Sequence, residues 1–94
     1  MPIKRCTLDG RSIHSLDDLY DRLASRLALP GHFGRNLDAL RDVLSTDIEG
    51  PFGIVWKHAR DSKTSMGKDF DRVVKLLREL EKERNDFKLT IEQQ

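Results

Sequence analysis

Apolar and polar positions along the chain predict three short strands. Residues 2–7 and residues 87–91 alternate between apolar and polar side chains, as expected of strands with one covered face. The first of these segments is followed by an Asp9-Gly10 turn. Residues 52–56 are apolar without alternation, which is typical of a strand covered on both faces or nearly so.

Apolar residues at helical spacing predict three helices between these strands. The first begins at an N-cap, Ser15, and ends near residue 29, and the second runs from an N-cap, Asn36, to about residue 45. The third and longest spans residues 66–84, while residues 57–63 are compatible with a short helix or a loop. The apolar stripes are Leu16, Leu19, Tyr20, Leu23 and Leu27; Leu37, Leu40, Val43 and Leu44; and Met66, Phe70, Val73, Val74, Leu77 and Leu80.

The order of these elements predicts an α/β fold. Strands that are separated by helices pair in parallel through right-handed crossovers. We therefore expect a single small domain over residues 1–94, in which helices pack mainly on one side of a three-stranded parallel sheet. A chain of 94 residues holds one core and little spare interior, which leaves small room for a deep catalytic cleft.

Composition limits the classes of partner. The chain has 17 Lys and Arg residues against 16 Asp and Glu, a net charge of +1, so it has no general attraction for nucleic acid or anionic membrane. No apolar run approaches the roughly 18 residues of a membrane span, and the basic N-terminus lacks the apolar stretch of a signal peptide. The single cysteine, Cys6, excludes an internal disulfide. We expect a cytoplasmic protein that binds neither membrane nor nucleic acid directly.

The second predicted helix carries a surplus of acidic residues. Asp38 and Asp42 lie one turn apart on the face opposite its leucines, with Arg35 near them at the helix entrance. Residues 38–49 hold four acidic residues and one basic residue. Because an i,i+4 pair of like charges mildly destabilises its own helix, the pair favours a basic partner, although solvated side chains without a partner remain the alternative. Glu79 on the longest helix would extend this patch if the two helices are neighbours.

Catalytic and metal sites find little support in the sequence. Two carboxylates fall short of the six to eight oxygens that Ca²⁺ prefers, and the three histidines are scattered, without metal-ligand spacing. His32 beside Asp38 is the one arrangement that suits general acid–base catalysis, and no pocket-forming motif accompanies it. We expect no cofactor, no metal and no enzymatic activity.

Residues 27–44 resemble the barstar family, whose members are intracellular inhibitors of barnase-type ribonucleases. They read LALPGHFGRNLDALRDVL and match the family pattern L-P-x-[YF]-[YF]-G-x-N-L-D-A-L-x-D-x-L at nearly every fixed position. The likeness continues through residues 51–56, the Arg78-Glu79 pair and the closing strand. The resemblance implies a small parallel sheet with flanking helices. It also implies that the second helix and its preceding loop enter a ribonuclease active site, where carboxylates replace RNA phosphates.

The resemblance assigns roles to individual carboxylates. Asp42 matches the one that inserts deepest, Asp38 matches the one a turn earlier, and Glu79 matches a supporting acid on the long helix. An active site that binds phosphate is cationic, so close opposite charges would both steer and anchor the complex.

The loop and the helix start receive roles in the same way. His32, beside Phe33, stands where the family has an aromatic that stacks in the active site, and Arg41 stands where it has an aromatic contact. Gly34 and Asn36 match the turn and the cap that aim the loop and helix.

The resemblance therefore implies a stoichiometric inhibitor of a small extracellular-type ribonuclease. The inhibitor would be a monomer when free, and it would protect its own cell from the toxic ribonuclease. A barstar-like module for a non-ribonuclease basic protein or toxin is the alternative, because His32 and Arg41 depart from the family pattern.

Overall fold

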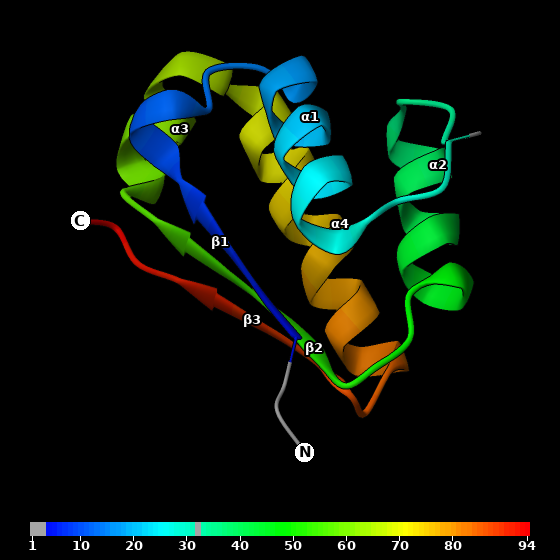
Figure 1. Ribbon diagram of the computed structural model, residues 1–94. Helices are drawn as coiled ribbons and strands as arrows, with labels where there is room; N and C mark the ends of the chain where they lie inside the picture. Colours follow the sequence, from blue (N-terminus) through cyan, green and yellow to red (C-terminus); the bar gives the residue numbers. More distant parts are fainter. Residues whose placement is uncertain (1–3, 32) are drawn as a thin grey trace.

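Three parallel strands form one sheet in the order β1-β2-β3 (Figure 1). The computed structural model describes residues 4–31 and 33–94. The strands are β1 (Lys4–Asp9), β2 (Phe52–Lys57) and β3 (Phe87–Ile91). The α/β prediction is confirmed. The first strand extends two residues beyond the predicted end, while residues 2 and 3 lie outside the described part.

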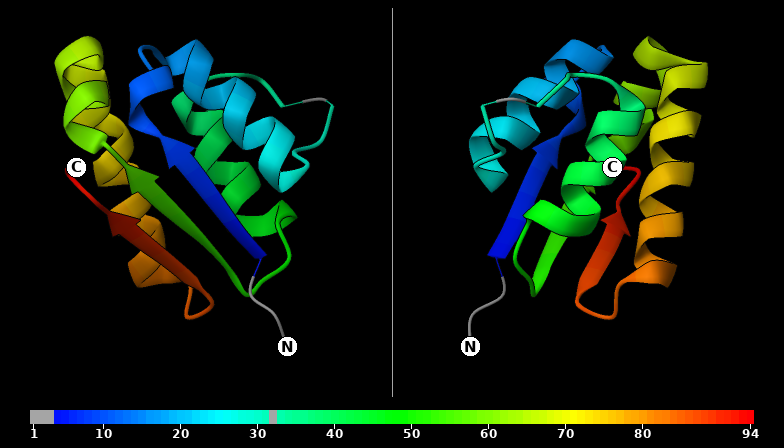
Figure 2. Two further views of the ribbon diagram at one scale, coloured as in Figure 1. Left: turned by 60° about the vertical axis from the view of Figure 1, so that its left-hand side comes forward. Right: turned by 90° about the vertical axis from the view of Figure 1, so that its right-hand side faces the viewer.

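The helices cover one face of this sheet (Figure 2). The parallel register places Cys6 beside Ile54 and Ile54 beside Leu89, and all three side chains are buried beneath the helices. The opposite face carries Arg5 and Lys88, both exposed, around a shallow hollow of about 500 Å³. Residues 52–56 therefore form a strand as predicted, at the centre of the sheet, although helices protect only one of its faces.

Both predicted N-caps are present. The Ser15 hydroxyl accepts a hydrogen bond from the Asp18 backbone N–H at the start of α1 (Leu16–Leu27). The Asn36 side-chain oxygen accepts one from the Ala39 N–H, 2.8 Å away, at the start of α2 (Leu37–Asp42). These bonds satisfy backbone donors that an α-helix leaves free in its first turn.

Gly67 separates two helices, and the predicted long helix begins only after it. The helix before it is α3 (Ala59–Met66), in a region that the sequence left open as a short helix or a loop, and the long helix is α4 (Lys68–Glu83). Gly67 has φ 61° and ψ −127°, a conformation open in practice only to glycine, so the helix cannot continue through it. The expectation of one helix over residues 66–84 was therefore wrong in its first turn.

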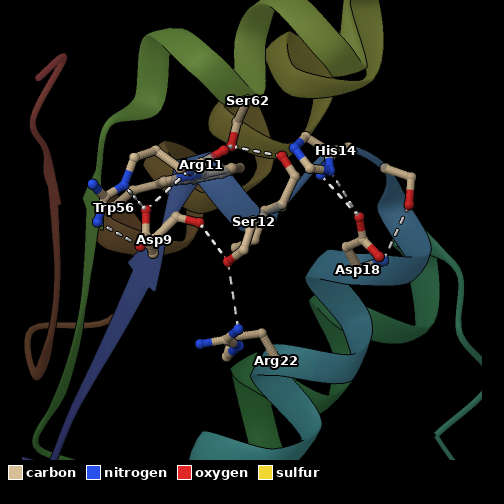
Figure 3. Close-up of polar contacts among 11 residues, drawn as sticks. Asp9, Arg11, Ser12, His14, Asp18, Arg22, Trp56 and Ser62 are labelled. Carbon is tan, nitrogen blue, oxygen red and sulfur yellow. Dashed lines mark hydrogen bonds and ion pairs between the residues drawn. The ribbon is translucent and has the colours of Figure 1, made fainter.

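A buried serine joins α3 to the segment after β1 (Figure 3). Ser62 has no exposed surface, and its hydroxyl accepts a hydrogen bond from the Trp56 indole at 3.1 Å. The same hydroxyl lies 3.1 Å and 2.9 Å from the carbonyl oxygens of Gly10 and Ile13. The expected Asp9-Gly10 turn is a 3₁₀ turn, η1 (Gly10–Ser12), and the Ser62 hydroxyl links its first residue, Gly10, and the following Ile13 to α3.

Glu81 links α4 to β3. Its carboxylate accepts a 2.8 Å hydrogen bond from the Leu89 N–H and pairs with Arg78 at 3.1 Å. The backbone bond is the main cause that lowers the pKa of Glu81 below 4.5, and Arg78 adds to it. A carboxyl whose pKa is lower in the folded state stabilises the fold above its unfolded pKa, and loses that contribution as pH falls through the folded pKa.

Glu81→Gln is therefore expected to destabilise the protein at neutral pH by about 1 kcal/mol, since a neutral acceptor replaces a charged one. The difference from wild type should shrink as pH falls from 4.5 through the lowered pKa of Glu81, because wild-type Glu81 then becomes protonated as well. Urea denaturation of both proteins at pH 7 and near pH 3 measures this. A difference that stays constant across this range would contradict the assignment.

Candidate partner-binding surface

The loop before α2 is fastened to α1 by an aromatic contact. The Phe33 ring meets the Tyr20 ring edge-on at 5.5 Å between centroids, and the Phe33 N–H donates to the Pro30 carbonyl. Phe33 is half-buried, so part of its ring packs within the protein, against Tyr20, and the rest faces solvent. The expected contact at His32 lies outside the described residues.

Gly34 and Asn36 shape the start of α2. The Asn36 amide donates to the Gly34 carbonyl while its oxygen caps the helix. A Cβ at Gly34 would lie 3.3 Å from that of Ala39, which is a tight contact. Both residues thus shape the start of the helix, and the Asn36 side chain makes its hydrogen bonds within the molecule.

Asp38 and Asp42 form an exposed pair that we call the acidic ridge. Leu40 and Leu44 on the opposite side of the helix are buried, which turns both aspartates outward. Within residues 4–31 and 33–94, no cationic side chain lies within ion-pair distance of either carboxylate. Residues four apart on a helix have Cβ atoms about 5–6 Å apart, so the ridge presents two negative charges one turn from each other.

Arg41 binds two carboxylates of α4, Glu79 and Glu83, which we call the α4 acids. Its guanidinium lies 3.1 Å from the Glu79 carboxylate and also pairs with Glu83. Figure 2 shows α2 between α1 and α4, so the Arg41 side chain on α2 can reach the neighbouring α4. Glu79 is therefore next to α2, as the sequence suggested, but it is already paired. The sequence did not predict that Glu79 pairs with Arg41, nor that Glu83 shares the same arginine.

Arg35 makes the equivalent contact on the other side of α2. It lies 3.4 Å and 3.0 Å from the carboxylates of Asp17 and Asp21, which we call the α1 acids. The guanidinium also lies over the Tyr20 ring, 5.7 Å from its centroid. Arg35 therefore faces α1, whereas the sequence placed it beside the acidic ridge. With Asp38 it lines an open hollow of about 660 Å³ between the two helix starts.

Arg84 fastens the far end of the second helix. Beyond Asp42 the chain continues as a π-helical turn, η2 (Val43–Asp47). Arg84 donates to the carbonyls of Leu44 at 2.7 Å and Ile48 at 2.9 Å, on and just after this turn. It also forms two 2.8 Å bonds with Asp86. The sequence analysis missed this residue. In the polar sequence at the end of a helix, an arginine that binds backbone carbonyls looks the same as one that is solvated.

Other chemistries find no support in residues 4–31 and 33–94. No three His, Cys, Asp or Glu side chains of this part come together as a metal site would require. None of its helices combines the length and the apolar character needed to cross a membrane. Cys6 is fully buried, and desolvation raises the pKa of its thiol to about 11, which disfavours the reactive thiolate.

The fold, the capped second helix and the acidic ridge together define a small α/β protein with an exposed pair of aspartates on that helix. Residues 3–93 match the family described as Barstar (barnase inhibitor), so the chain belongs to the barstar family. It is also 34% identical over 91 residues to a Bacillus subtilis (strain 168) protein named "Putative ribonuclease inhibitor YrdF". That match covers 96% of this chain and 100% of the relative.

Proposed function

We propose that this protein inhibits a small extracellular-type ribonuclease by placing the acidic ridge in the cationic active site of the enzyme. The observation that carries the proposal is the exposure of Asp38 and Asp42, without counter-ions among the described residues, on a helix held at both ends. Membership of the barstar family and the name of the B. subtilis relative support a ribonuclease as the partner class.

The physical basis is replacement of phosphate by carboxylate. A ribonuclease binds RNA phosphates with cationic side chains, and two carboxylates on a rigid helix offer those side chains similar negative charge. The Asn36 cap and the Arg84 contacts hold the helix before binding, which reduces the entropy lost on association. Opposite charge also speeds the encounter of the two proteins.

The proposed inhibitor acts one to one, as a monomer when free, without turnover or cofactor. Its cellular role is protection: a cell that makes a ribonuclease for export needs a cytoplasmic protein that blocks any enzyme remaining inside. His32, Phe33 and Gly34 would line the contact from the loop side, and Glu79 and Arg41 from the α4 side.

Titration of the purified protein into small basic ribonucleases tests this proposal. We expect RNA cleavage to fall linearly to zero at one equivalent, and the affinity to decrease as ionic strength rises, because charge pairs dominate the contact. Turnover of RNA by the protein itself, or affinity independent of salt, would contradict it. If no ribonuclease is inhibited, the partner is of another class, such as a non-ribonuclease toxin.

A further inference from the structure

The acidic ridge is bordered on both sides by arginines that are already paired. Arg35 holds the α1 acids on one side, and Arg41 holds the α4 acids on the other. Each arginine contacts two carboxylates, so it offsets one of the two negative charges. The only carboxylates of α2 are those of the ridge, and within the described residues they have no such partner.

We propose that Arg35 and Arg41 are specificity-determining residues that confine the strongly negative surface to Asp38 and Asp42. The matching enzyme would then have a compact cluster of cationic groups and a less basic surround, whereas ribonucleases with a broad basic cleft would be rejected. This inference rests on the proposed function and adds to it the kind of active site that the protein accepts.

The reason for rejection is that a basic surface extending past the ridge meets a guanidinium on either side. A cation of the partner that approaches the α1 or α4 acids meets one uncompensated negative charge instead of two, with a guanidinium directly beside it. That guanidinium faces the positive surface, and like charges brought together at an interface are costly. Without the two arginines, a continuous acidic band would cross α1, α2 and α4 and attract any broad basic surface.

The energies of these pairs also favour a role in recognition over one in folding. The side chains of Arg35 and Arg41 are 43% and 38% exposed. The four carboxylates that they bind are each at least 46% exposed. Ion pairs at such positions contribute typically about 0–1 kcal/mol to stability. The same charges still set the potential that an approaching protein meets.

Arg41→Gln and Arg35→Gln test the inference, with inhibition constants measured against ribonucleases of graded basicity. Each variant is expected to tighten inhibition of the most basic enzymes by about tenfold. It should also steepen the salt dependence and leave stability within about 1 kcal/mol of wild type. Lys88→Gln is the matched control, because it removes the same charge from the sheet face that no helix covers.

The outcomes separate the two proposals. If wild type inhibits a ribonuclease and Arg41→Gln gains no more than Lys88→Gln against the basic enzymes, the inference is wrong and the proposed function stands. If Arg41→Gln inhibits a basic ribonuclease that wild type ignores, the inference is supported in its strongest form. If neither wild type nor any variant inhibits a ribonuclease, both proposals fail together.

Discussion

Asp42→Ala is expected to weaken ribonuclease inhibition by at least about thirtyfold and up to several-thousandfold. Removal of one partner from a buried, hydrogen-bonded charge pair costs about 2–5 kcal/mol or more, a general range that draws in part on a complex of this same family. Much of the loss comes from the enzyme's cation, which stays buried in the complex without a counter-ion. Inhibition constants for wild type and variant, measured on the same enzyme, give the ratio directly.

The same substitution should leave the free protein intact. Asp42 is exposed and has no ion-pair partner among the described residues, and its removal relieves repulsion from Asp38 one turn away. We therefore expect the free energy of unfolding to stay constant or rise by a few tenths of a kcal/mol. Asp71→Ala, another exposed helical aspartate, is the control and should inhibit like wild type. Equal inhibition by the two variants would remove Asp42 from the interface.

Arg84→Ala is expected to destabilise the protein by about 3 kcal/mol, because it removes several charged hydrogen bonds and leaves two carbonyls without their donor. The Arg84 side chain is only 15% exposed, and its guanidinium also covers the Phe52 ring at 4.9 Å. Such a loss is a large part of the 5–15 kcal/mol that stabilises a typical domain. Urea denaturation measures it.

The conservative variant Arg84→Lys separates charge from geometry. A lysine keeps the positive charge but cannot bind Asp86 with two parallel bonds while also reaching Leu44 and Ile48. It should recover less than half of the lost stability. Because these contacts hold the end of the helix that carries the ridge, both variants should also inhibit more weakly. Full recovery by lysine would show that the fork-shaped contact is unimportant.

Much of the fold follows from local patterns that the sequence displays. Ser15 and Asn36 cap their helices as predicted, because the signal depends only on residues a few positions away. The alternation in residues 87–91 matches β3 to the residue. The break at Gly67 was missed, since one glycine within an apolar stripe is compatible with a continuous helix until its φ and ψ are known.

The candidate site was predicted less completely, for a physical reason. The outward direction of Asp38 and Asp42 follows from helical periodicity alone. The partners of Arg35, Arg41 and Arg84 depend on which elements lie side by side, which composition and spacing do not encode. Exposed charges looked equivalent in the sequence, yet the structure separates the ridge from carboxylates that are already paired.

The central claim is that the acidic ridge and RNA phosphate compete for one cationic site. The most direct test is calorimetric titration of this protein into a ribonuclease that it inhibits. The titration is run with and without a saturating nucleoside 3′-monophosphate in the active site of the enzyme. We predict that the nucleotide raises the apparent Kd by a factor of one plus the ratio of its concentration to its own Kd, because both ligands cannot occupy the site together. An affinity unchanged by the bound nucleotide would place the contact elsewhere on the enzyme and contradict the account.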